Sequence, residues 1–291
     1  MRGVRDAMHD MIYAMRGVRD VLGALADLFF PRCCAVCGDP LRLYEKHLCT
    51  YCLAEMPYTY FWRYGGNPVE AVFAGRSYIE FGCSLFYYTD SYRLMVHQFK
   101  YNSNVEIGLW LGKKLGEKIG EMLGEKLLGK KLSGEKLSGY KENNNVPIDF
   151  IVPVPLHWRK KWRRGYNQSE VIAKGVAKGV VRGLVQNGRE PFSPPVIIPD
   201  LLKRKRFTNT QTHKDRLDRW SNVCNAFELN RRPFTRLRRL TLKHPELDLA
   251  GKHILLIDDV LTTGATLEAC ASILVEELGC KVSIATLAYV E

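Results

Sequence analysis

The feature that most constrains the fold is the segment 254–266, which reads ILLIDDVLTTGAT. Its first four residues are apolar without alternation, which is typical of a strand buried on both faces of a parallel sheet. The acidic pair Asp258 and Asp259 follows at once, and apolar residues then recur at helical spacing up to Gly279. We therefore predict a strand, a polar turn and a helix that ends at Gly279. Open α/β sheets bind ligands at the carboxyl ends of such strands.

The polar turn after the acidic pair contains three threonines and a glycine within 262–266. Such a turn presents hydroxyls and backbone N–H groups to a phosphate, and the start of the following helix adds a favourable field. Two adjacent carboxylates repel a bare phosphate, so Asp258 and Asp259 suit ribose hydroxyls, directly or with Mg²⁺ nearby. The segment has neither the Gly-Lys-Ser/Thr of a Walker A loop nor a Gly-x-Gly-x-x-Gly turn. The pattern favours a phosphorylated ribose as ligand.

The run resembles the phosphoribosyl-pyrophosphate (PRPP) signature of type I phosphoribosyltransferases, in which an apolar strand precedes Asp-Asp and Thr-Thr-Gly-Ala-Thr. This resemblance implies an α/β fold with a parallel sheet flanked by helices. It also implies that Asp258 and Asp259 contact the ribose hydroxyls. The residues that would hold the 5′-phosphate are Thr262, Thr263, Gly264, Ala265 and Thr266. An ordinary strand, turn and capped helix is the alternative interpretation.

Two Cys-x-x-Cys motifs, at 34–37 and 49–52, are separated by 11 residues near the N-terminus. Thiolates from Cys34, Cys37, Cys49 and Cys52 can close a tetrahedral Zn²⁺ site and stabilise a segment too short for its own core. Two disulfides are the competing interpretation, and a redox role is less favoured because the second motif is so near. An odd count of nine cysteines favours a reducing compartment. We expect a small zinc ribbon in a cytoplasmic protein, with Cys33 as an alternative ligand to Cys34.

The domain organisation follows from composition. We expect residues 1–30 to form a helical extension, in which MRGVRD at 1–6 recurs at 15–20 and leaves the start open between Met1 and Met15. Residues 31–60 contain the zinc module, and 61–291 form a phosphoribosyltransferase-like domain. No run of 18 apolar residues is present, so we expect no membrane span. Charged residues interrupt the first thirty residues throughout, which argues against a secretory signal.

A repetitive segment rich in glycine and lysine divides the larger domain. Glycines recur every four residues from 108 to 124 and then every five residues to 139. A four-residue period keeps glycine near one helix face, whereas a five-residue period rotates it away. Each internal glycine costs about 1 kcal/mol relative to alanine. We predict a helix that weakens beyond about residue 125, and a low-complexity insertion at about 112–146. The interleaved lysines exclude a membrane Gly-x-x-x-Gly dimer.

Basic residues concentrate between Leu156 and Lys243, where 22 lysines and arginines occur with 6 acidic residues. Within this range, a predicted buried strand at 149–155 leads directly into LHWRKKWRRGYNQ at 156–168. Strand ends of a parallel sheet share one crevice, so these cations would lie on the same side as Asp258. The charge suits a polyanionic substrate or nucleic acid, and a solvated basic loop is the simpler alternative.

The combination of motifs is similar to the ComF family of competence-associated phosphoribosyltransferase-like proteins. The motifs are the double Cys-x-x-Cys, VPVP at 152–155, RGYNQ at 164–168, RFTNTQ at 206–211 and the PRPP signature. Type I phosphoribosyltransferases bind pyrophosphate in the loop after the strand that matches 149–155. The resemblance therefore implies that Arg159, Arg163 and Arg164 form a pyrophosphate loop. The glycine-rich insertion and residues 228–247 depart from the family pattern.

The resemblance implies a protein that binds PRPP or a related phosphoribosyl ligand with Mg²⁺ and transfers the phosphoribosyl group, with release of pyrophosphate, in DNA uptake. Preorganised cations would stabilise the leaving group without a covalent nucleophile or general base, so no catalytic residue is assigned. The basic run 203–206 would close over PRPP or contact a nucleic acid backbone. The alternative function is non-catalytic binding of single-stranded DNA, in which Trp158, Trp162 and Tyr166 stack bases while cations contact phosphates. The sequence does not identify an acceptor.

Overall fold

The structure, a computed structural model, describes residues 32–101, 105–132, 148–186, 193–205, 226–230 and 249–291. The chain divides into two compact units, Met1–Met56 and Pro57–Glu291. The division falls four residues before the predicted start of the larger domain, because Tyr58 forms a β-bridge with Phe86 and Thr59 N–H donates to Leu85 O at 3.1 Å. The expected extension at 1–30 lies outside the described residues. No helix among the described residues combines the length and apolarity needed to cross a bilayer.

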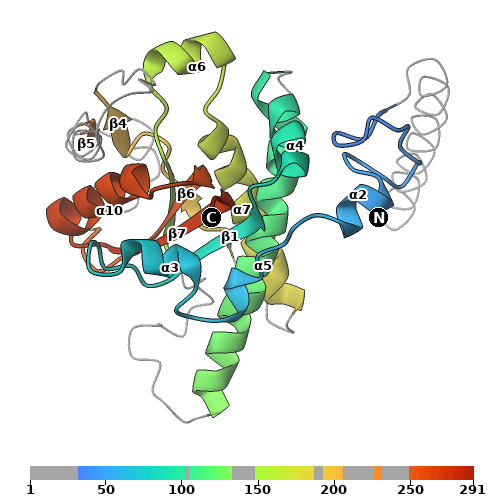
Figure 1. The fold of residues 1–291 in the computed structure, drawn as a ribbon. Coiled ribbons are helices and arrows are strands. Elements are labelled where there is room, and N and C mark those ends of the chain that lie inside the picture. Colours follow the sequence, from blue (N-terminus) through green and yellow to red (C-terminus); the bar gives the residue numbers. More distant parts are fainter. Residues whose placement is uncertain (1–31, 102–104, 133–147, 187–192, 206–225, 231–248) are drawn as a thin grey trace, which may run out of the picture. The chain divides into compact units, whose positions relative to one another are not determined.

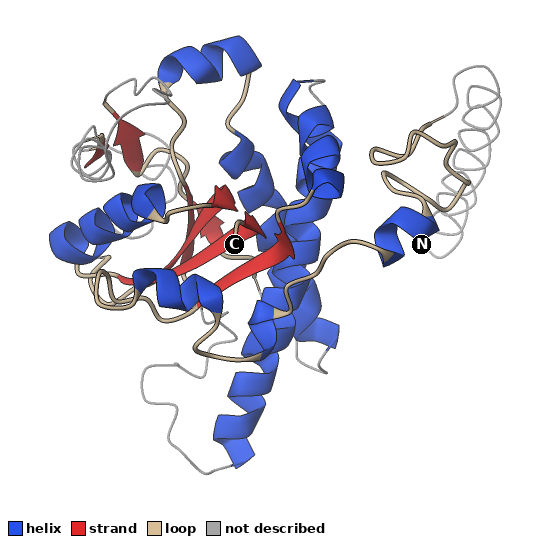
Figure 2. Ribbon diagram, viewed as in Figure 1, coloured by secondary structure: helices blue, strands red, loops and turns tan. Residues whose placement is uncertain are grey.

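The second unit is built on a five-stranded sheet in the order β1-β7-β6-β2-β3, and every neighbouring pair is parallel (Figures 1 and 2). The strands are β1 (Gly82–Tyr87), β2 (Phe150–Pro153), β3 (Val196–Ile197), β6 (His253–Leu261) and β7 (Lys281–Tyr289). Ile254 to Ile257 in β6 are fully buried, as the unbroken apolar run predicts. The predicted parallel sheet flanked by helices is confirmed.

Two helices pack together along one face of this sheet, α5 (Val105–Leu132) and α7 (Gln168–Gln186) (Figure 1). Glycines line their contact: 112, 116 and 120 in α5, and 175, 179 and 183 in α7. A Cβ atom built on Gly116 would lie 2.3 Å from Val176 O, and one on Gly179 would lie 2.2 Å from Lys113 O. Only glycine lets the two backbones approach this closely.

The predicted glycine face therefore exists, but its partner is a second helix of the same chain. Helix α5 continues to Leu132, beyond the point near residue 125 where we expected it to weaken. It also buries Leu115 and Ile119 completely. Residues 112–132 of the expected insertion are thus helical, and up to Leu123 the helix is packed, because close glycine contacts and apolar burial outweigh the poor helix propensity. Residues 133–147 lie outside the described residues.

The other face of the sheet is covered by α10 (Ala265–Leu278) and α3 (Pro68–Phe73) (Figure 1). Helix α10 ends at Gly279, which has a left-handed φ of 64°, as predicted. Buried Asn67 caps α3: its Oδ1 accepts from the backbone N–H groups of Val69 and Glu70, and its Nδ2 donates to Gly82 O at 2.9 Å. This one side chain ties α3 to the start of β1.

The remaining elements of the second unit lie around the sheet. They are η1 (Phe61–Arg63), α4 (Asp90–Tyr101), α6 (Trp158–Arg164) and the antiparallel pair β4 (Leu202–Arg204) and β5 (Phe227–Leu229). In Figure 1, α6 and the β4–β5 pair lie beyond the sheet on the side to which the strands point.

Candidate functional site

The acidic pair lies inside the last part of β6, which continues four residues beyond the apolar run 254–257 and pairs Asp258 with Thr286 of β7. The Oδ1 atom of Asp258 accepts a hydrogen bond from Ser169 Oγ at 3.0 Å and another from the backbone N–H of Asp259 at 2.9 Å. Both carboxylates are half-buried. The Asp258 carboxylate is therefore held in a fixed orientation by the start of α7.

Helix α4 also contacts the acidic pair, in addition to the start of α7. The hydroxyl of Tyr92 donates to the backbone carbonyl of Asp259 at 3.2 Å, and Tyr92 is fully buried. Burial raises the pKa of Tyr92 well above its ordinary value, and the charges of Asp259 and Asp258 add to this effect. The phenol thus stays protonated as a donor. No local sequence pattern links the two partners, because they are 167 residues apart.

The hydroxylated turn leads directly into α10. Thr262 and Thr263 are exposed, and α10 starts at Ala265. Gly264 is the N-cap, with φ of 78° and no side-chain hydrogen bond to the helix start, and a Cβ atom there would lie 2.6 Å from Val72 Cγ1. The first N–H groups of a helix without a side-chain cap are suited to an anion. The turn has the form expected of a phosphate site beside the acidic pair.

The start of α7 is fixed to the neighbouring strand. Asn167 donates through Nδ2 to Val154 O at 3.0 Å, and its Oδ1 accepts from the backbone N–H of Ser169 at 3.3 Å. Asn167 therefore caps the start of α7. Ser169, which holds Asp258, was not among the predicted site residues. Its only sequence signal was its place in the first turn of a helix that follows a strand of the sheet.

The three predicted pyrophosphate residues Arg159, Arg163 and Arg164 lie on α6, so the segment that we expected to be a loop is a short helix. His157 forms its N-cap and accepts from the backbone N–H of Arg159 at 3.3 Å. The Arg159 guanidinium lies 5.2 Å from the centre of the Trp158 ring. Because α6 follows β2 within a few residues, its cations are on the carboxyl side of the sheet.

The described part of the basic run 203–206 lies on and directly after strand β4, so Lys203 and Arg204 belong to the antiparallel β4–β5 pair. Lys203 and Lys205 point outward and both pair with Glu228, at 2.7 Å for Lys203. Arg204 alternates to the other side, is half-buried and lies over the Phe227 ring. Burial lowers the pKa of Arg204, and the charges of Cys270 and Asp258 oppose this. The charges of Arg204 and Asp258 are close enough to interact, while Arg206 lies outside the described residues.

The first unit contains the predicted cysteine cluster. The sulfur atoms of Cys34, Cys37, Cys49 and Cys52 all lie within 4.8 Å of one another. Cys33 is exposed and is not part of the cluster, which resolves the ambiguity in favour of Cys34. Gly38 follows the first pair with φ of 81°, and Cys49 is the N-cap of α2 (Thr50–Ala54). These four cysteines can hold a metal ion such as zinc.

The protonation of the cluster fits a metal site. Burial opposes ionisation of the Cys34 thiol, but backbone N–H groups that donate to its sulfur lower its pKa to about 7. Burial and the adjacent thiols raise the pKa of Cys52. Several thiolates at this spacing repel one another, so full ionisation requires a bound cation. A divalent, thiophilic ion is the natural partner for this donor set.

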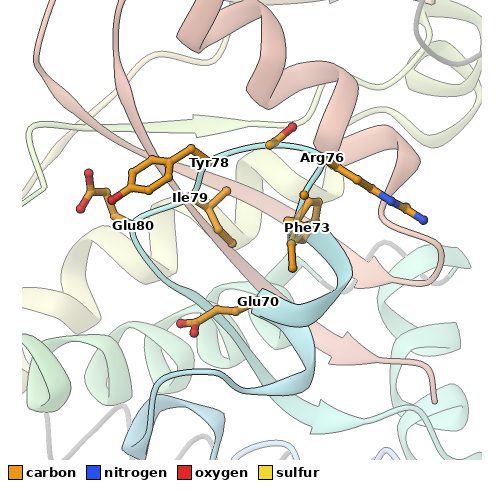
Figure 3. Close-up of a pocket in the computed structure, with 9 residues that line it drawn as sticks. Glu70, Phe73, Arg76, Tyr78, Ile79 and Glu80 are labelled. Atoms are coloured by element: carbon orange, nitrogen blue, oxygen red, sulfur yellow. The ribbon is translucent and has the colours of Figure 1, made fainter.

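A surface pocket of about 460 Å³ lies elsewhere, between α3 and β1 (Figure 3). Phe73 and Ile79 form its apolar part, and Glu70 lies beside them. The Glu70 carboxylate already accepts from the backbone N–H groups of Gly66 and Gly82, at 2.6 and 3.1 Å. The Glu70 side of the pocket lies at the start of β1, whereas Phe73 also borders the turn before α10, where a Cβ atom built on Gly264 would lie 3.3 Å from the Phe73 ring.

Comparison with known proteins places the chain among relatives. A model of the phosphoribosyl transferase domain matches residues 167–291. The DNA utilization protein YhgH of Salmonella typhi is 27% identical over 260 residues, which cover 85% of this chain and 92% of the relative. Competence protein F of Haemophilus influenzae is 30% identical over 128 residues, 43% of each chain.

The matched domain starts at Asn167 and includes α7, β6 and α10, which together carry the acidic pair and the hydroxylated turn. The predicted resemblance is thus confirmed at two levels, the domain and the named relatives. Residues 167–291 of the chain match the phosphoribosyl transferase domain, and the chain is homologous to the proteins named DNA utilization protein YhgH and Competence protein F.

Proposed function

We propose that the protein binds PRPP or a related phosphoribosyl ligand with Mg²⁺ and transfers the phosphoribosyl group, with release of pyrophosphate, in the context of DNA uptake. One observation carries the proposal. The Asp258 carboxylate, held by Ser169 at 3.0 Å, precedes a turn whose helix start has no side-chain cap. An acidic pair beside an anion-binding turn matches a ligand that has hydroxyls next to a phosphate.

In this proposal the 5′-phosphate lies on the turn formed by Thr262, Thr263, Gly264, Ala265 and Thr266. The ribose hydroxyls donate to Asp258 and Asp259, which are half-buried, and the Asp258 carboxylate is held by Ser169. Mg²⁺, when bound, would neutralise charge on the diphosphate, and the acidic pair supplies the hard oxygen ligands that it prefers. The names of the relatives support the link to DNA uptake.

The chemical step needs no covalent nucleophile from the protein. The bond between ribose C1 and the diphosphate oxygen breaks, and its electron pair leaves with pyrophosphate. A lone pair of the acceptor forms the new bond at C1. Arg159, Arg163 and Arg164 stabilise the leaving group, because a guanidinium pairs with phosphate oxygens in a bidentate way. Their position on α6, directly after β2, supports this role.

We further propose that the cysteine cluster binds structural Zn²⁺ and that the protein is cytoplasmic. Cysteines can ligate zinc only while they are reduced, so the cysteine cluster supports a reducing compartment. The bound metal would stabilise residues 32–56, since so short a segment buries little apolar area.

The enzyme proposal is tested by PRPP-dependent release of pyrophosphate with a panel of nucleobases and amines as acceptors. We expect release with wild-type protein and its loss in the double variant Asp258→Asn, Asp259→Asn. Asp149→Asn is the matched control, because Asp149 lies at the opposite end of the sheet, where it accepts from His253 N–H at 2.9 Å. Unchanged release in the double variant would refute the assignment.

Binding of single-stranded DNA is a second candidate function, favoured by one observation. Trp158 and Trp162 are 65% and 86% exposed on α6, four residues apart and therefore on one helix face, among cationic side chains. Exposed aromatic rings stack bases while cations contact phosphates.

This second function predicts that replacing both tryptophans by alanine weakens binding of a fluorescent oligonucleotide by at least tenfold, at about 1–3 kcal/mol per stacked base. Tyr78→Ala removes an equally exposed ring at the amino end of the sheet and should leave affinity unchanged. Affinity should also fall steeply with salt. Equal binding by wild type and the tryptophan variant would exclude α6 as the DNA surface.

A further inference from the structure

Gln168 is the first residue of α7, and it combines burial with an unsatisfied donor. It is only 3% exposed. Its Nε2 atom has no hydrogen-bond partner among the described residues. A buried amide donor without a partner destabilises a fold, so such groups are usually satisfied by a ligand, water or ion that belongs to the site.

The neighbours of Gln168 show that this is not a loosely formed helix end. On one side, Asn167 is bonded to Val154 O and to the N–H of Ser169. On the other side, Ser169 is bonded to Asp258. Side chains at the first position of a helix point back past the helix start. The Gln168 amide is therefore directed toward the carboxyl edge of the sheet, between the ends of β2 and β6.

The charges around this point favour an anion over a cation. The N-terminus of the 19-residue helix α7 carries a partial positive charge. The cationic helix α6, with Arg163 and Arg164 in its last turn, immediately precedes it. The Glu170 carboxylate in the first turn is paired with Lys174 at 2.8 Å. Asp258 is the one acidic group bonded to this helix start in the described structure, and it is the residue already proposed for the ribose.

We infer that Gln168 is a specificity-determining residue that donates a hydrogen bond from Nε2 to an oxygen of the ligand's diphosphate group. The inference rests on the proposed function and refines it. The turn before α10 binds the 5′-phosphate, and the start of α7 binds the diphosphate group of the same ligand. Gln168 thereby separates PRPP from ribose 5-phosphate, which lacks the diphosphate.

The test compares three ligands by calorimetry in Mg²⁺ buffer: PRPP, inorganic pyrophosphate and ribose 5-phosphate. Gln168→Met removes the donor and keeps the length of the side chain. We expect about tenfold weaker binding of PRPP and pyrophosphate, equivalent to about 1.4 kcal/mol, and unchanged binding of ribose 5-phosphate. Gln168→Glu should weaken both diphosphate ligands further, because it adds a negative charge. Gln186→Met, at the exposed opposite end of α7, is the matched control.

Thermal unfolding without ligand provides an independent readout. Replacing an unsatisfied buried amide by an apolar group should leave the Tm of Gln168→Met equal to or above that of wild type. A lower Tm together with loss of all three ligands would assign Gln168 a structural role and overturn the inference. Equal binding of pyrophosphate by wild type and Gln168→Met would overturn it as well. If wild-type protein bound neither PRPP nor pyrophosphate, the proposed function itself would fail.

Discussion

Gly116 of α5 lies against the backbone of α7, with no room for a side chain. A Cβ atom at this position would be 2.3 Å from Val176 O and 2.9 Å from the Cα of Gly179. Both neighbours are backbone atoms of a helix, so they cannot rotate away as a side chain would. Gly116→Ala therefore requires the two helices to separate by about 1 Å before the new contact becomes normal.

The expected size of the effect comes from two opposing terms. In a helix that packs against nothing, alanine is favoured over glycine by about 1 kcal/mol. Overpacking of a rigid core costs about 1–3 kcal/mol, and backbone contacts on both sides place this substitution at the upper end. The net prediction is a destabilisation of about 2 kcal/mol. For a unit of this size, that corresponds to a decrease in Tm of about 4–8 °C.

Thermal unfolding followed by circular dichroism measures this change. The matched control is Gly65→Ala, because Gly65 is exposed, has an ordinary backbone conformation and places its nearest neighbour 3.9 Å from the new Cβ. The control should leave Tm unchanged or raise it slightly, by the loss of unfolded-state entropy. If Gly116→Ala also raised Tm, helix propensity would dominate and the close packing of α5 on α7 would be refuted.

Two further predictions concern the metal cluster and the tyrosine beside the acidic pair. Metal analysis of purified protein should show that Cys49→Ser reduces bound zinc from about one equivalent per chain to less than about half. Cys33→Ser should leave the zinc content unchanged. Equal loss of zinc in both variants would contradict the assigned ligand set. Tyr92 has a raised pKa in the folded state, so its contribution to stability is complete below about pH 10 and is lost as pH rises further. Above pH 10, the free energy of unfolding measured in urea should fall by about 1.4 kcal/mol per pH unit more for wild type than for Tyr92→Phe. The same pH dependence of this free energy in both proteins would refute a buried, neutral phenol.

The sequence was most informative where one local pattern determines the structure. The apolar run 254–257 can only be buried in the middle of a sheet, and Gly279 provides the left-handed residue that ends α10. The cysteine spacing similarly predicted the cluster in the first unit. In each case the neighbouring residues alone impose the constraint.

The contacts that the sequence did not predict join distant segments. Ser169 and Asp258 are 89 residues apart, and Tyr92 and Asp259 are 167 apart, so no local pattern links them. The continuation of α5 beyond residue 125 was not predicted for the same reason. Its glycines are unfavourable in an isolated helix and become favourable only against the matching glycines of α7. That match requires both helices to be considered as a pair.

The central claim is that a phosphoribosyl ligand binds where Asp258 and Asp259 meet the turn before α10. Calorimetric titration of the full chain with PRPP in Mg²⁺ buffer tests it most directly. We predict one site per chain for wild type, and affinity at least about a hundredfold lower, about 2.7 kcal/mol, for Asp258→Asn with Asp259→Asn. Undiminished PRPP binding by the double variant, or no binding by folded wild-type protein, would contradict the claim.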